Sequence, residues 1–131
     1  EPLHEEIDKY KTCGVGPGMP FAHEVLAKDP NFGVIGLVPC AIGGTKITDW
    51  AKGSSTGHYK ELVERANASL KSGGKIKALL WYQGESDTQQ QTDARLDKRR
   101  LKRLFTNIRA DLNSPNLQII QVWFLFHLIF Y

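Results

Sequence analysis

Two short polar segments contain the groups of this sequence that are best suited to chemistry. Residues 40–45 read Cys-Ala-Ile-Gly-Gly-Thr and residues 83–87 read Gln-Gly-Glu-Ser-Asp, and each segment follows an apolar run. Backbone amides of Gly43 and Gly44 carry no side-chain obstruction, which suits them to hold an oxyanion. In the second segment Gln83 offers a side-chain amide and Glu85 a carboxylate. Loops after strands are often rich in Gly and Asp simply to turn the chain, so each segment alone is a weak signal.

Two further features invite a chemical interpretation, and each has a plainer one. Cys40 would need a nearby base or positive field to become a nucleophile, and its sequence neighbours supply neither, which favours a small buried thiol. The glycine-rich run at 14–18 lacks the preceding strand and the third glycine of a phosphate-binding loop. We therefore expect a turn there.

Composition and net charge indicate a globular protein and give no support for a nucleic-acid-binding one. Of the 131 residues, 41% are hydrophobic and 24% are charged, which is ordinary globular usage. A net charge of +3 is too small to indicate a nucleic-acid partner. Residues 95–103 hold six basic side chains and one acidic one, but an apolar stripe predicts that these charges form the solvated face of a helix.

Metal sites and membrane segments find no support in the sequence. Cys13 and Cys40 have neither zinc-ligand nor disulfide-framework spacing. No apolar run reaches the roughly 20 residues of a membrane helix. The acidic opening, residues 1–6, is unlike a basic and then apolar leader. We expect no metal, no cofactor and no membrane partner.

Alternating elements must position the two polar segments. Periodicity predicts helices over 19–28, 57–72 and 92–113, the last with Thr92 as its cap. A continuous apolar run predicts a buried strand over 33–38, and a second buried strand and a third strand are predicted over 76–82 and 117–122. Such alternation is typical of a parallel sheet covered by helices, which binds ligands at the carboxyl ends of its strands.

The residues around both polar segments resemble signature blocks of a known family. Residues 36–50, GLVPCAIGGTKITDW, look like the second block of plant carbohydrate esterases of the sialate O-acetylesterase type, and residues 81–87, WYQGESD, look like the third. Residues 14–22, GVGPGMPFA, resemble the loop and helix between the first and second blocks. The resemblance runs from about residue 13 to about residue 122.

This resemblance implies a fold, an activity and a set of site residues. The expected fold is α/β, a three-layer α/β/α flavodoxin-like parallel sheet of the SGNH-hydrolase kind, incomplete. The expected activity is removal of acetyl groups from carbohydrates or other small esters. Gly44, with Gly43 beside it, and Gln83 would bind the oxyanion, and Glu85 would orient a histidine or brace its loop. Trp50 is the better candidate for stacking on a sugar ring, since Trp81 lies within a predicted strand.

Two strings of the family are absent. The nucleophile belongs to a Gly-Gln-Ser-Asn string and the base to an Asp-x-x-His string, and the sequence contains neither. We expect a partial esterase domain over 1–122 and a divergent apolar tail over 123–131, inactive by itself. The alternatives are a catalytically dead or carbohydrate-binding remnant and, more remotely, a basic nucleic-acid-binding module. A missing strand also predicts self-association through an exposed sheet edge.

Overall fold

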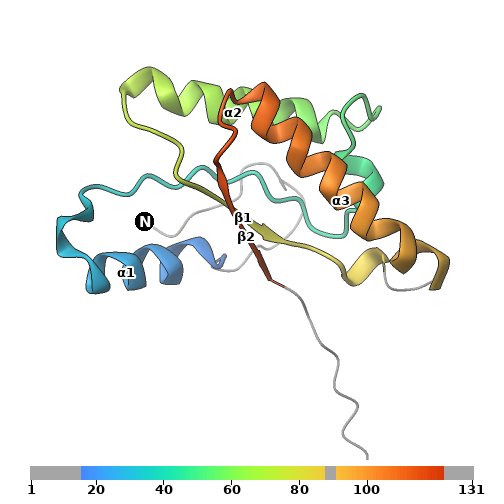
Figure 1. The fold of residues 1–131 in the computed structure, drawn as a ribbon, viewed down its shortest axis with the longest axis horizontal. Helices are drawn as coiled ribbons and strands as arrows, with labels where there is room; N and C mark the ends of the chain where they lie inside the picture. The colour runs from blue at the N-terminus through green and yellow to red at the C-terminus, as the bar shows by residue number, and fades with distance from the viewer. Residues whose placement is uncertain (1–15, 88–90, 123–131) are drawn as a thin grey trace, which may run out of the picture. The chain divides into compact units, whose positions relative to one another are not determined.

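The computed structural model describes residues 16–87 and 91–122, which fall into two compact units, Glu1–Gly43 and Gly44–Tyr131. Figure 1 shows the elements in chain order. The first fifteen residues, including Cys13, lie outside the described residues, as does the predicted apolar tail at 123–131. Both strands of the sheet belong to the second unit.

The first unit contains one helix and a long extended segment. Helix α1 spans Gly18–Lys28, close to the predicted 19–28, and the short 3-10 helix η1 follows at Pro30–Phe32. Pro30 disfavours a helical conformation for Asp29, so α1 ends there. The Asp29 carboxylate caps the next turn by accepting the Asn31 N–H at 3.1 Å. Within the described residues 16–43 no side chain is fully buried.

The strand predicted over 33–38 does not form, and that prediction was wrong. These residues have no strand hydrogen bonding, and Val34 and Val38 are 100% and 41% exposed. Gly33 has φ +93, outside the extended region that strands occupy. An apolar run becomes a strand only when a neighbour pairs with its N–H and C=O groups, and residues 33–38 have no such neighbour among those described.

The second unit contains the longer helices, as predicted from periodicity. Helix α2 spans His58–Ser69 and is extended by the 3-10 helix η3 at Leu70–Ser72. Gly73 follows with φ +88, a conformation that ends helices readily. Helix α3 spans Gln91–Asp111 and so begins one residue before Thr92. The exposed face of α3 carries Lys98, Arg99, Lys102 and Arg103, as expected of a solvated helix face.

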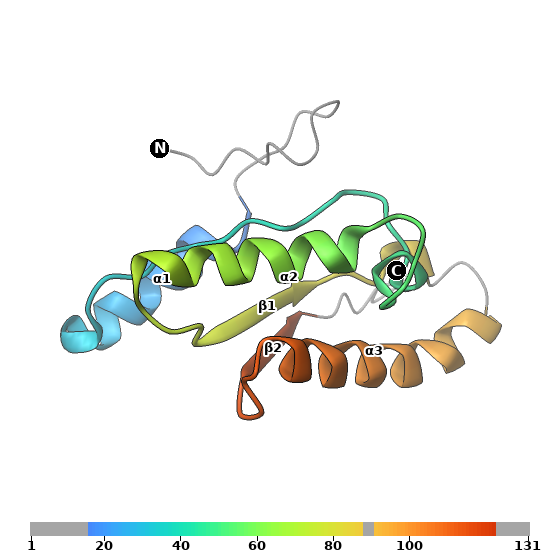
Figure 2. The same cartoon turned by 90° about the horizontal axis from the view of Figure 1, so that it is seen from above.

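Two parallel strands form the sheet of the second unit. Strand β1 spans Ala78–Tyr82 and pairs with β2, Gln118–Val122, in a register that places Trp81 opposite Gln121. In Figure 1, α2 and α3 lie on the same side of the strand pair. Figure 2 shows both helices running in one direction, opposite to the strands. This is the β-α-β arrangement that alternating elements predict.

The core lies entirely within the second unit. Among the described residues, the fully buried apolar side chains come from the 3-10 helix η2 at Ile47–Trp50, from α2, β1 and α3, and from the loop before β2. Trp81 packs edge-on against Trp50 and Phe105, with ring centroids 5.5 and 5.9 Å apart. The buried set is Ile47, Trp50, Tyr59, Leu62, Trp81, Leu101, Leu104, Ile108, Leu112 and Leu117.

The observed class is therefore α/β with a small parallel sheet. It has helices on one face of two strands in the second unit, consistent with the incomplete SGNH-like fold that the resemblance implies.

Candidate active site

A side-chain hydrogen bond joins the two polar segments. Gln83, the first residue after β1, donates from Nε2 to the carbonyl oxygen of Thr45 at 3.3 Å. The two residues are 38 positions apart in the sequence. The end of β1 and the residues just before η2 therefore meet.

Asp87 is a second link between these segments, which sequence reasoning missed. It belongs to the 3-10 helix η4 at Glu85–Asp87 and is 3% exposed, the one fully buried charged residue among those described. Its Oδ2 accepts the backbone N–H of Ile47 at 2.9 Å and a hydrogen from Gln83 Nε2. Asp87 closes the WYQGESD string, but its partner Ile47 lies 40 residues away, so local spacing does not indicate this contact.

The Gln83 amide is fully used as a donor. Its two N–H groups match two acceptors, the Thr45 carbonyl oxygen and the Asp87 carboxylate. Among the described residues the Gln83 carbonyl oxygen makes no hydrogen bond, and that atom accepts rather than donates. Direct donation from Gln83 to an oxyanion would require the release of one of these bonds.

Gly44 presents the backbone donor of the segment. It has φ +75, a conformation that favours glycine over residues with a Cβ, and it is exposed. Within the described ranges, its N–H makes no hydrogen bond. Gly43 is also exposed. Gly44 is thus a donor held next to the tethered Thr45.

The η2 turn holds Thr45 and Trp50 together. Asp49 Oδ2 accepts the Lys46 N–H at 2.8 Å, and Trp50 Nε1 donates to Thr45 Oγ1 at 2.9 Å. Trp50 is 4% exposed, and its ring lies 5.3 Å from that of His58 as well as against Trp81. The burial of the Trp50 ring favours a role in the core. Stacking of Trp50 on a sugar ring stays a prediction.

For Glu85 and Cys40, the structure says less about a chemical role. The backbone of Glu85 belongs to η4, but its side chain lies outside what the structure describes, so its role as acid or brace stays a prediction. Cys40 is half-buried, and its thiol lies 3.7 Å from the Val38 carbonyl oxygen as a donor. A thiol that donates locally is consistent with the structural interpretation of Cys40.

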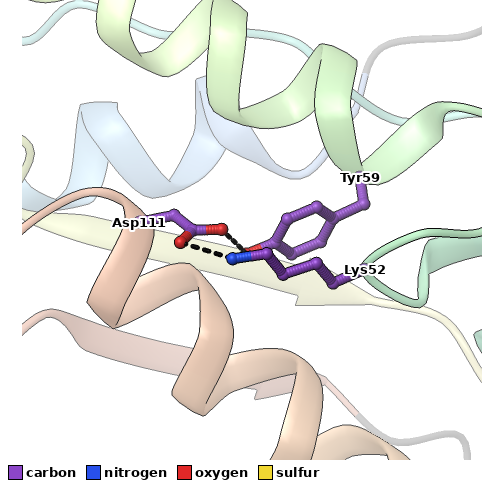
Figure 3. A network of polar contacts seen from close by, with 3 residues as sticks. All are labelled: Lys52, Tyr59 and Asp111. Carbon is purple, nitrogen blue, oxygen red and sulfur yellow. Dashed lines mark hydrogen bonds and ion pairs between the residues drawn. The ribbon is translucent and has the colours of Figure 1, made fainter.

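A polar network on α3 is structural rather than catalytic in character (Figure 3). The Asp111 carboxylate accepts from Lys52 Nζ at 2.7 Å and from the Tyr59 hydroxyl at 2.6 Å. Burial and then the bond to Asp111 raise the pKa of Tyr59, while the bonds from Lys52 and then Tyr59 lower the pKa of Asp111. The network ties the loop after η2 and the start of α2 to the end of α3.

Neither a metal centre nor a membrane helix emerges from the described part of the chain. Within residues 16–87 and 91–122, no three His, Cys, Asp or Glu side chains are grouped to hold a metal ion. Over the same ranges, no helix combines the length and apolarity that crossing a membrane requires.

Comparison with known proteins adds the chemical context of these segments. A family model described as carbohydrate esterase, sialic acid-specific acetylesterase, matches residues 1–126. A probable carbohydrate esterase of Arabidopsis thaliana, At4g34215, is 53% identical over 123 residues, covering 93% of this chain and 46% of that protein. An X-ray structure for the same Arabidopsis locus is similar at a TM-score of 0.80 and 50% identity, over 91% of this chain and 50% of that one. This chain spans about half the length of that curated relative.

Proposed function

Because the chain belongs to the sialic acid-specific acetylesterase family of carbohydrate esterases, we propose that it forms the oxyanion side of an active site that hydrolyses O-acetyl esters of carbohydrates. The observation that carries this proposal is the hydrogen bond from Gln83 to Thr45, which joins the two polar segments. It lies next to the N–H of Gly44, which makes no hydrogen bond to any residue that the structure describes. The proposed substrate is an acetylated carbohydrate or another small ester.

The chemistry assigns a part to each group. A serine attacks the acetyl carbonyl, a histidine takes the proton of the serine, and negative charge collects on the carbonyl oxygen. The N–H of Gly44, with Gly43 beside it, would donate to that oxygen, and Gln83 would add a side-chain donor by releasing one of its two hydrogen bonds. Loss of one such donor costs an acyl-transfer enzyme about 10²–10³ in kcat. Glu85 would orient the histidine or brace the loop, and the reaction requires neither metal nor cofactor.

This chain alone is expected to bind rather than turn over. Its 131 residues contain neither the Gly-Gln-Ser-Asn nor the Asp-x-x-His string, so no nucleophile and base of the family pattern are present. The chain should hydrolyse p-nitrophenyl acetate no faster than a heat-denatured control. Turnover well above that control, abolished by a serine-directed inhibitor, would contradict the assignment and show that another serine acts as the nucleophile.

The oxyanion pocket itself can be tested without turnover. Acetate is the product of the proposed reaction, and its carboxylate resembles the charged oxygen of the transition state. Titration with acetate should shift the ¹H–¹⁵N signal of Gly44 in a saturable way. Gly74 is the matched control, because it too is exposed at positive φ, +101, and precedes β1 instead of facing its carboxyl end. Equal responses at both glycines, or none at Gly44, would count against the pocket.

A further inference from the structure

We propose that Asp87 is the positioning residue of this pocket: its buried carboxylate fixes the loop that carries Gly44 against the end of β1. That the pocket binds an oxyanion rests on the proposed function. That Asp87 holds the loop rests on the hydrogen bonds of its carboxylate. Asp87 is not expected to touch the ester.

A single oxygen of Asp87 makes both contacts. Oδ2 accepts the Ile47 backbone N–H at 2.9 Å and a hydrogen of the Gln83 amide. The two donors come from different segments, η2 and the residue after β1. Because Asp87 is only 3% exposed, water cannot readily replace either donor, and a charged acceptor strengthens both bonds.

The contacts hold two of the residues that follow Gly44 in the loop. Ile47 lies three residues after Gly44 and is held by Asp87, while Thr45 lies one residue after it and is held by Gln83. Gln83 is itself held by Asp87. Loss of the Asp87 carboxylate would therefore release both bonds to it, from the Ile47 N–H and from the Gln83 amide, and leave Gln83 with the Thr45 carbonyl oxygen as its remaining acceptor among these contacts.

The negative charge of Asp87 also means that it cannot stabilise an oxyanion as the N–H of Gly44 would. A carboxylate beside a developing oxyanion would oppose it by like-charge repulsion. The N–H groups of Ile47 and Gln83 both converge on the Asp87 oxygen and partly neutralise its charge. A carboxylate so engaged suits the loop-holding role and does not suit direct contact with the reacting carbonyl.

Hydrogen exchange of backbone amides in the full chain tests the bond between Ile47 and Asp87. In the unsubstituted chain the Ile47 N–H should exchange with solvent at least about tenfold more slowly than the N–H of Thr48, because within the described residues Thr48 makes no backbone-amide hydrogen bond. Equal exchange at Ile47 and Thr48 would overturn the proposal before any variant is made.

Substitution of Asp87 then separates a positioning role from general stability. Asp87→Ala should abolish the protection of Ile47 and shift both side-chain N–H signals of Gln83. Asp87→Asn should restore the protection, because the Asn amide oxygen can occupy the place of Oδ2 and accept the same two donors. If Asp87→Ala does not fold, the Asn variant decides: an unprotected Ile47 in a folded Asp87→Asn chain contradicts the link.

Asp49→Ala is the matched control for these signals. The Asp49 carboxylate also accepts a backbone N–H in η2, that of Lys46 at 2.8 Å, but that contact stays within the turn. The Asp49→Ala variant should leave the Gln83 side-chain signals in place. If Asp49→Ala moved them as far as Asp87→Ala does, the link would not be specific to Asp87.

The acetate titration connects this link to function. The response of Gly44 should disappear in Asp87→Ala and persist in Asp87→Asn. A Gly44 signal that responds equally in Asp87→Ala and in the unsubstituted chain would overturn the positioning role while leaving the pocket intact. A Gly44 signal that responds in no variant would instead contradict the proposed function, whereas the Ile47 and Gln83 signals would still report on Asp87.

Discussion

At the scale of single residues, the network of Lys52, Tyr59 and Asp111 makes the stability of the second unit depend on pH at both ends of the scale. The pKa of Asp111 lies below its ordinary 3.8 in the folded chain, so its stabilising effect is present above that pH and is lost as the pH falls further. The pKa of Tyr59 lies above its ordinary 10.0, so its stabilising effect is present below pH 10.0 and is lost as the pH rises.

Variants of the two residues should remove these dependences separately. Asp111→Asn should flatten the acid limb of a plot of melting temperature against pH, and Tyr59→Phe should flatten the alkaline limb. Loss of the Tyr59 hydroxyl bond should also lower the free energy of unfolding at neutral pH by about 1 kcal/mol. Glu64→Gln is the control, because the pair of Glu64 and Lys60 is long at 3.7 Å and well exposed. A Glu64→Gln effect as large as that of Asp111→Asn would show that the network has no special weight.

The site residues illustrate how far sequence reasoning reaches. The resemblance at 81–87 predicted that Gln83 and the loop of Gly44 lie close together, and Gln83 does bond to Thr45, whereas an oxyanion-binding role for Gln83 stays a prediction. The link through Asp87 could not be predicted because it depends on the Ile47 N–H, 40 residues away, and a backbone amide carries no sequence signal. The packing of Trp50 was missed for a similar reason, since Trp81 and His58 enclose its ring only after folding.

At the scale of elements, α3 contributes more fully buried apolar side chains than any other element that the structure describes. Ile108 is 0% exposed at the centre of the stripe formed with Leu101, Leu104 and Leu112. Ile108→Ala should lower the free energy of unfolding by about 2–5 kcal/mol, since it removes a buried side chain and leaves a cavity. Chemical denaturation measures this change.

Lys102→Ala on the same helix is the control for Ile108. Lys102 is exposed, so its removal should change the free energy of unfolding by less than about 0.5 kcal/mol. Similar losses for the two variants would mean that α3 does not bury its apolar stripe.

The elements also show which sequence signals decide structure. The periods of α1, α2 and α3 predicted each helix to within a few residues, because an amphipathic stripe is encoded locally. The segments at 76–82 and 117–122 became β1 and β2 although each contains polar side chains, whereas the wholly apolar run at 33–38 did not become a strand. Apolar composition therefore does not decide between them; β1 and β2 each have a ladder partner in the other, and residues 33–38 have none among those described.

At the scale of the whole molecule, both described strands of the small sheet are edge strands. Among the described residues it has two strands, so β1 and β2 each pair on one side only. On β2, Ile120 and Val122 are 38% and 43% exposed. An apolar strand with open N–H and C=O groups is a template for pairing with another chain. We propose that a second copy of this chain pairs there.

Size-exclusion chromatography tests this association. The chain should elute as a dimer or larger species, and Ile120→Lys should shift it toward the monomer by placing a charge on the strand. Deletion of residues 123–131, which lie outside the described residues and contain no formal charge and no proline, should improve solubility. A clean monomer peak with cooperative thermal unfolding would contradict the proposed edge pairing.

The perpendicular indoles of Trp50 and Trp81 have a spectroscopic consequence. Their rings lie at 84° with centroids 5.5 Å apart. Their polar surroundings differ, since Trp50 Nε1 donates to Thr45 whereas the buried Trp81 Nε1 has no hydrogen-bond partner among the residues that the structure describes. Two immobile chromophores at this separation couple their electronic transitions, and shielding from water moves their emission to shorter wavelengths. Near-ultraviolet circular dichroism and fluorescence therefore report on the closeness of η2 to β1, the same closeness that sets the Gly44 loop, with no label attached to the protein.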